Sequence, residues 1–257
     1  MAKVIAPFII SGTLDDLNFM DTTEGNLVRE KREDYMTSAE FMANPIYDPI
    51  RAHGKEMGYC ALKSRMFRQL AVQLYTKSKE MSFAGRANQI LFEIIEEDAV
   101  HPKGHRTLEQ GMQSPFLNEI ILSFEGNKHR PLSKVLLLPF VVNTEERIIS
   151  LANFNAKEHL EWPAEATHVH LAMATASWDY VNDAFDTCYS EEIIVERDSQ
   201  TQSLSLSTAK PKEHRISLTY LYIGFAKKVR RKYKLLHRRE NTVSIIGFVL
   251  NPSPAQS

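Results

Sequence analysis

The segment Arg215–Ala226 reads RISLTYLYIGFA, and the segment Thr167–Ser177 reads THVHLAMATAS. Both are apolar runs in which every second residue faces the same way in an extended chain, and both are rich in the β-branched and aromatic residues that favour strands. Gly, Asn, Asp, Pro or Ser residues interrupt the chain around such runs. We therefore predict that these two segments are strands of a sheet.

The same pattern continues from Phe116 to the C-terminus. The further runs are EIILSFEG, SKVLLLPFVVN, RIISLANFN, SEEIIVERD, QSLSLST and TVSIIGFVL. Short strands at this spacing predict an antiparallel, immunoglobulin-like β-sandwich over residues 116–257, without a long helix.

The first 115 residues have a different pattern. Residues 3–31 predict an extended segment, Lys3–Ser11, followed by a β-hairpin around the turn Thr23–Asn26, with a bend at Gly12. Residues 50–78 and 83–97 repeat apolar residues at helical spacing and predict two amphipathic helices. The expected apolar positions are Met57, Ala61, Phe67, Leu70 and Leu74 in the first helix and Phe83, Ala87, Ile90, Leu91 and Ile94 in the second. Ser82 is a candidate N-cap. The fold class is α+β, with a boundary near residue 115.

Three separate patches of the N-terminal half resemble a family of uncharacterised bacterial proteins. The matching residues are Gly12, Thr13, Phe19, Gly25, Leu27, Val28 and Arg29, then Pro45, Tyr47, Arg51, Glu56, Met57 and Gly58, then Gly104, Arg106 and Gly111. Pro49 departs from the pattern. The resemblance covers residues 1–112 and implies a hairpin, helices and a C-terminal β-sandwich. It implies no established activity, so it supplies no catalytic residue.

Within these patches, Tyr47, Arg51 and Glu56 could be read as an active site. The structural interpretation is stronger, because Pro45 and Tyr47 would fix the entry into the helix. Arg51 and Glu56 are not at the i,i+4 spacing of a helical ion pair, so each is expected to hold another segment, such as the hairpin.

Positive charge is concentrated near the C-terminus, although the formal net charge of the chain is only −1. Eight of the thirteen residues in 227–239 are basic: Lys227, Lys228, Arg230, Arg231, Lys232, Lys234, Arg238 and Arg239. Residues 141–200 carry twelve acidic and three basic residues, a net charge of −9, and residues 201–257 carry two acidic and eleven basic residues, a net charge of +9. The basic run is either one strand or a hairpin with its tip at Arg230–Arg231.

The sequence contains none of the motifs that bind nucleotides or activate a nucleophile. His168 and His170 share a strand face and could contact one metal ion, but no third ligand is indicated. Cys60 and Cys188 are interpreted as small apolar residues, with a single cross-link as the alternative. We therefore expect no enzyme activity, no catalytic residue, no cofactor and no metal.

Two functions remain. The separated charges favour a structural or interaction protein that self-associates into a ring or filament, with the basic run facing an acidic region of the next copy. The alternative is a nucleic-acid-associated protein that uses residues 227–239, with Tyr233 and His237 stacking on bases. No apolar run approaches the length of a membrane span, and the expected location is the cytoplasm.

Overall fold

The computed structural model describes residues 2–22, 25–31 and 36–251. By its contacts the chain forms two compact units, Met1–Ile50 and Arg51–Ser257. The protein combines helices with antiparallel sheets, as the sequence predicts.

The N-terminal unit contains a four-stranded antiparallel sheet with the order β1-β4-β3-β2. Its strands are β1 (Ala2–Lys3), β2 (Gly12–Leu14), β3 (Leu17–Thr22) and β4 (Gly25–Glu30). The predicted hairpin is confirmed, since β3 pairs with β4 from Leu17–Glu30 to Thr22–Gly25. Thr23 and Glu24 of the predicted turn lie outside the described residues. Helix α1 (Ser38–Ala43), which begins with a capping box between Thr37 and Glu40, and the 3-10 helix η1 (Pro45–Tyr47) follow.

The prediction of an extended segment over Lys3–Ser11 is wrong beyond Lys3. Residues 4–11 form a loop without strand pairing. Its two ends are held by one residue, because the Val4 amide donates to the Asn26 carbonyl and the Asn26 side-chain amide donates to the Ile10 carbonyl, at 2.8 and 2.6 Å. Gly12, which follows the loop, has a φ of +113°, which explains the predicted bend.

The second unit is built on a six-stranded antiparallel sheet whose central strands are β7 (His168–Asp179) and β11 (Ile216–Val229). They pair over eleven residues, from Ile216–Trp178 to Ala226–His168. Along the outer edge of β11 lie β13 (Thr242–Leu250) and β12 (Lys232–Leu235), and along the outer edge of β7 lie β8 (Ala184–Tyr189) and β9 (Ile193–Glu196).

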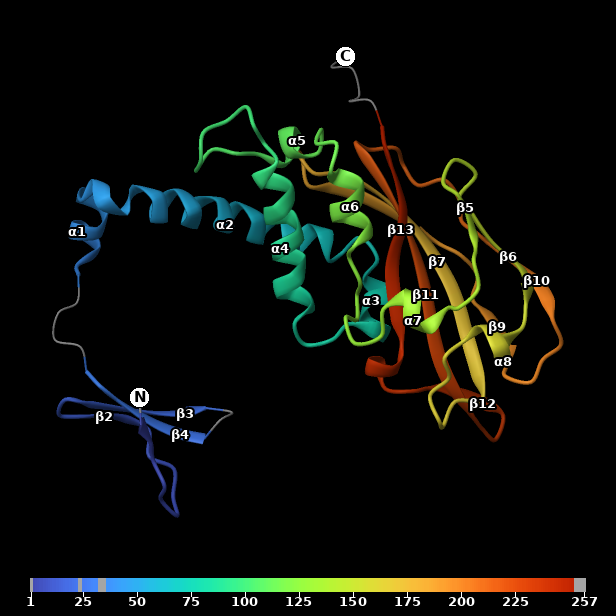
Figure 1. Cartoon of the computed structure of the whole chain (residues 1–257), viewed down its shortest axis with the longest axis horizontal. Helices are drawn as coiled ribbons and strands as arrows, with labels where there is room; N and C mark the ends of the chain where they lie inside the picture. Colours follow the sequence, from blue (N-terminus) through green and yellow to red (C-terminus); the bar gives the residue numbers. More distant parts are fainter. Residues whose placement is uncertain (1, 23–24, 32–35, 252–257) are drawn as a thin grey trace. The chain divides into compact units, whose positions relative to one another are not determined.

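Both faces of this sheet are covered, which explains why the runs that predicted β7 and β11 are almost continuously apolar. Tyr220 and Tyr222 belong to a core shared with the helices, whereas Leu221 and Ile223 belong to a core on the opposite face. The second core is closed by a small sheet with the order β10-β6-β5. Figure 1 shows α4 and α6 on one side of the sheet, and β5, β6 and β10 on the other.

The helices of this unit are α2 (Asp48–Phe67), α3 (Val72–Ser78), α4 (Phe83–Glu96), α5 (Leu108–Gly111), α6 (Leu117–Leu122), α7 (Leu132–Val135) and α8 (Ala156–His159). The predicted single helix over 50–78 is broken at residues 68–71, where Ala71 has non-helical dihedral angles. The break redirects the chain so that Tyr75 packs against Tyr220, with ring centroids 5.8 Å apart. Ser82 does occupy the N-cap position of α4, as predicted, but its hydroxyl donates to Glu80 and makes no capping bond to the helix.

The prediction for α4 is confirmed, since all five of its expected apolar positions are buried. In α2 the prediction is half wrong. Phe67 is buried, but Met57 and Ala61 are exposed, and the buried positions include Glu56 and Lys63. A paired charge takes the place of an apolar residue at these two sites, as described below.

The small sheet consists of β5 (Val141–Asn143), β6 (Ile148–Phe154) and β10 (Gln202–Ser207). Two of the predicted strands need correction. EIILSFEG is not a strand: it begins within α6 and ends in a turn, with only an isolated bridge from Glu125 to Ser244. SKVLLLPFVVN begins within α7 and becomes a strand only at Val141. The prediction that residues 116–251 contain no long helix is confirmed for this described range, because α6, with six residues, is the longest there. No helix in the described part of the chain is long and apolar enough to cross a membrane.

Candidate functional site

The basic run forms a hairpin rather than one strand. Strands β11 and β12 pair from Ala226–Leu235 to Val229–Lys232, which places Arg230 and Arg231 at the tip. Paired residues of antiparallel strands share a face, so Lys228 and Tyr233 lie on one face and Lys227 and Lys234 on the other. The alternation of four cations along one strand face therefore does not occur.

Most of the charge in this hairpin is free. The eight basic residues of the run are all exposed. Lys227 lies 3.7 Å from Glu165 and Arg239 lies 3.1 Å from its neighbour Glu240. Among the described residues, no carboxylate pairs with the cations at the hairpin tip, namely Arg230, Arg231, Lys232 and Lys234. Arg238, which follows β12 in η2 (Arg238–Glu240), lines a cavity of about 320 Å³ together with Arg68 and Lys79.

Arg230 has a φ of +57°, a left-handed conformation that costs a non-glycine residue about 1 kcal/mol. We predict that Arg230→Gly raises the free energy of unfolding by about that amount, measured by urea denaturation. Arg231→Gly removes the same charge at the neighbouring position, where φ is not positive, and should give no gain. Equal effects of the two substitutions would contradict this prediction.

His168 and His170 lie on the face that carries Tyr233. The His168 ring is 4.7 Å from the Tyr233 ring, and burial lowers the pKa of His168. His170 is only 5% exposed, and its ring nitrogens make no hydrogen bond, although Nδ1 lies 3.4 Å from the Glu192 carboxylate. That carboxylate also lies 3.2 Å from Lys77. In the described part of the chain, no group of three or more His, Cys, Asp or Glu side chains could hold a metal ion.

Glu56, which the sequence analysis singled out, forms a buried ion pair with Arg106. The guanidinium donates from Nε and Nη2 to the two carboxylate oxygens, at 2.9 and 2.7 Å, and the Gly104 amide donates to the same carboxylate at 2.7 Å. These bonds, led by the one from Arg106, lower the pKa of Glu56 to about 2. Glu56 therefore holds another segment, as predicted, but this segment is the loop before α5 and not the hairpin.

The remaining motif residues do not meet at one site. Tyr47 stacks on Phe41 at 5.3 Å, after Pro45 has started η1. Gly25 has a φ of +117° and begins β4, on which Arg29 is exposed. Arg51 and Gly58 both lie on α2. Gly58 has open space where a Cβ would lie, so the packing of this unit does not require a glycine there.

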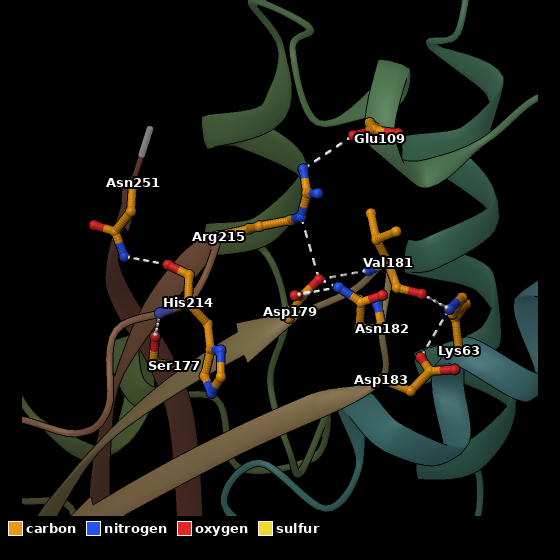
Figure 2. Close-up of polar contacts among 10 residues, drawn as sticks. All are labelled: Lys63, Glu109, Ser177, Asp179, Val181, Asn182, Asp183, His214, Arg215 and Asn251. Carbon is orange, nitrogen blue, oxygen red and sulfur yellow. Dashed lines mark hydrogen bonds and ion pairs between the residues drawn. The ribbon is translucent and has the colours of Figure 1, made fainter. Parts of the chain in front are cut away.

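A further polar network, which the sequence analysis missed, joins the helices to one end of the sheet (Figure 2). Arg215, directly before β11, reaches to Asp179 at the end of β7, at 3.2 Å, and to Glu109 of α5, at 2.9 Å. Asp179 also accepts bonds from the Val181 amide and from the Asn182 side chain, and Lys63 of α2 pairs with Asp183 at 2.8 Å. The contacts join residues up to 120 positions apart, which no local pattern reveals.

The charges in this network are paired with one another, so the network serves the fold. Each partner of Asp179 belongs to the turn that follows β7 or to the start of β11. Lys63 is buried, and its ammonium group donates to both the Asp183 carboxylate and the Val181 carbonyl. The two cysteines do not form the alternative cross-link: both are free, and Cys60 is buried.

Comparison of the chain with protein-family models, with curated proteins and with solved structures gave no match. The family resemblance stays a prediction, and the function must be argued from the structure.

Proposed function

We propose that this protein is a non-enzymatic structural or interaction protein that self-associates. The observation that carries this proposal is the N-terminal unit, in which none of the described residues between 2 and 50 is buried. A sheet of this size needs an apolar face covered by other residues to be stable in water. The unit therefore has the character of a surface that packs against a partner.

The exposed apolar side chains of this unit are numerous. They are Ile5, Phe8, Ile9, Leu14, Leu17, Met36, Met42, Ile46 and Ile50. Exposure of single apolar residues is normal, but nine in so short a segment are typical of an interaction surface. Ile5, Phe8 and Ile9, which are 95%, 64% and 68% exposed, project from the loop that Asn26 closes. The loop presents them without a helix or strand of its own.

The charge distribution supports contact between copies. The cations at the hairpin tip lack partners among the described residues, whereas residues 141–200 carry a net charge of −9. We propose that the hairpin faces an acidic region of a neighbouring copy, because opposite patches attract and fix the register of a complex. A contact between two different patches produces a ring or a filament.

We predict that the full-length protein forms oligomers at tens of micromolar and low salt, and that deletion of residues 1–11 weakens them. The deletion removes β1 and the three apolar side chains of the loop but no residue of the second unit. Sedimentation velocity measures the assembly, and thermal unfolding measures the second unit, which should change little. Raising the salt concentration should also loosen the oligomers, because exposed charges are screened. A full-length protein that remains monomeric under these conditions would contradict the proposal.

Association with nucleic acid is the second candidate function, and the exposed hairpin with its free cations and the 42% exposed Tyr233 favours it. A near-neutral chain is expected to bind DNA only non-specifically, at roughly 10⁻⁴–10⁻⁶ M in physiological salt. Fluorescence anisotropy with single-stranded and duplex DNA tests this. Tight, salt-resistant binding that is lost in the variant R230E/R231E/K232E would make nucleic-acid association the better proposal.

The finer classifications remain predictions. These are the immunoglobulin-like class of the C-terminal sandwich, the bacterial family and the cytoplasmic location. The immunoglobulin-like class is supported by the two antiparallel sheets that enclose the core between β7, β11 and the small sheet.

A further inference from the structure

Helix α2 buries charged side chains beside Cys60 and Phe67 and leaves small and apolar residues exposed. Its side toward the core carries Glu56 and Lys63, which are buried and paired with Arg106 and Asp183. Its opposite side carries an exposed stripe of small and apolar residues, defined here as Gly54, Gly58, Ala61 and Leu62. These four residues recur at positions i, i+4, i+7 and i+8, which share one face of a helix.

The exposed stripe is a genuine surface of this unit. Leu62 is 69% exposed, and a Cβ added at Gly54 or Gly58 would meet no atom within 4 Å. An amphipathic helix normally turns its apolar side toward the core. In α2 the core side carries two buried ion pairs beside Cys60 and Phe67, whereas Ala61 and Leu62 lie on the exposed side, where a partner could cover them.

The N-terminal sheet has a face of matching character. The strand register places Leu14, Leu17, Phe19 and Val28 on one face, and none of them is buried. The register also places two carboxylates on this face, those of Asp21 and Glu30, whereas Lys3 and Arg29 fall on the other face. The apolar face of the sheet is therefore acidic at its ends.

The basic residues of the helix have the spacing that this face requires. Lys55 is exposed near the N-terminal end of the stripe, where its Nζ also lies 3.3 Å from Nδ1 of His105, and Arg65 is exposed just beyond Leu62. The two residues are ten positions, or about 15 Å, apart along the axis. Asp21 pairs with Asn26, and Glu30 lies four residues farther along β4, which separates the two carboxylates by about 14 Å. If α2 lies along the strands, each of the two cationic side chains of the helix comes close to one carboxylate of the sheet. The apolar residues of the two surfaces then lie between these ion pairs.

We infer that the stripe of α2 is the docking surface for the apolar face of the N-terminal sheet of a second copy. This inference rests on the proposed self-association and assigns surfaces to it. Two copies of the sheet face are a poorer match for each other, because they would bring carboxylates together. The contact joins different surfaces, so it repeats head to tail from copy to copy.

A charge exchange between two variants tests this contact. D21K/E30K makes both surfaces basic, and K55E/R65E makes both surfaces acidic. At low salt, each variant alone should have a dissociation constant at least about tenfold higher than that of the native protein, because like charges then face each other. An equimolar mixture should recover the association, since each sheet then meets a helix of opposite charge. Sedimentation equilibrium and light scattering give the dissociation constants.

Control variants carry the same charge changes away from the two surfaces. Asp15→Lys with Asp16→Lys changes the turn before β3, and Lys103→Glu with Lys134→Glu changes exposed positions of the second unit. Both controls should assemble as the native protein does. Circular dichroism of every variant checks that the fold is retained.

The outcomes separate the two proposals. A native protein that is monomeric overturns both of them. A native protein that assembles, with variants D21K/E30K and K55E/R65E that assemble equally well, leaves self-association standing and overturns the contact at α2. A further variant combines all four changes, D21K/E30K/K55E/R65E, in one chain. If this variant associates like the native protein but the mixture does not, the two surfaces meet within one chain, which also overturns the inference.

Discussion

Replacing Arg106 with methionine is expected to lower the free energy of unfolding by about 3–5 kcal/mol at pH 7. Arg106 donates to both carboxylate oxygens of Glu56, and Glu56 is only 2% exposed. Methionine retains the apolar stem but removes the guanidinium, so the carboxylate is left buried with only the Gly104 amide as a partner. Urea denaturation followed by circular dichroism measures the loss.

The effect should depend on pH in a defined direction. The pKa of Glu56 is about 2 in the folded protein, below its ordinary value of 4.5. A lowered pKa means that the ionised form stabilises the folded state, so this stabilisation is fully present above about pH 4.5 and is lost as the pH falls toward 2. The difference between native protein and R106M should therefore shrink over that range, because Glu56 becomes protonated more readily in the variant.

An exposed ion pair provides the matched control. Lys157 and Asp198 lie 3.2 Å apart, with side chains that are 65% and 73% exposed. Lys157→Met should lower the free energy of unfolding by less than about 1 kcal/mol, since water screens such a pair. If R106M loses no more stability than K157M, the pair at Glu56 does not hold the loop before α5 in place.

The buried ion pairs also explain where sequence patterns mislead in this chain. Helical spacing placed Met57 and Ala61 on the core side of α2, because apolar residues usually occupy that side. The core side instead carries Glu56 and Lys63, whose partners Arg106 and Asp183 lie 50 and 120 residues away. Glu56 and Arg106 both belong to patches singled out from the sequence, but only the fold shows that they meet.

Period-two patterns predicted the long strands well and the short elements poorly. Strands β7 and β11 are within one to three residues of their predicted bounds because each is long and apolar. Strand β8, Ala184–Tyr189, was missed because AFDTCY alternates weakly and lies at an edge of the sheet. Helix α6 was taken for a strand because a short apolar run, here Ile120–Leu122, fits either period.

The candidate site shows the same division between local and distant information. The position of the hairpin tip at Arg230–Arg231 was one of two local alternatives, and strand pairing decides between them. The contact between Arg215 and Asp179 depends on the antiparallel register of β7 and β11, which brings their ends together. Periodicity gives the strands but not their register, so this network could not be derived from the sequence.

A tight contact between α4 and α5 leads to the second large prediction. A Cβ at Gly111 would lie 1.9 Å from the carbonyl oxygen of Ile94 and 2.8 Å from its carbonyl carbon. Both are backbone atoms near the end of α4, so a change of side-chain rotamer cannot make room. Gly111 is buried, and Ile94 belongs to the core that the helices share with the sheet. The absence of a side chain at position 111 is therefore what allows α5 to approach α4.

Gly111→Ala is accordingly expected to lower the free energy of unfolding by about 3 kcal/mol or more, because the two helices must separate to admit one methyl group. Gly58→Ala is the matched control: it makes the same change within a helix, at a position with open space, and should raise the free energy of unfolding by up to about 1 kcal/mol. Urea denaturation of both variants gives the comparison. If Gly111→Ala is too unstable to purify, its soluble yield beside that of Gly58→Ala gives the same ordering. A Gly111→Ala variant as stable as the native protein would show that α5 does not pack on α4 at the distance described.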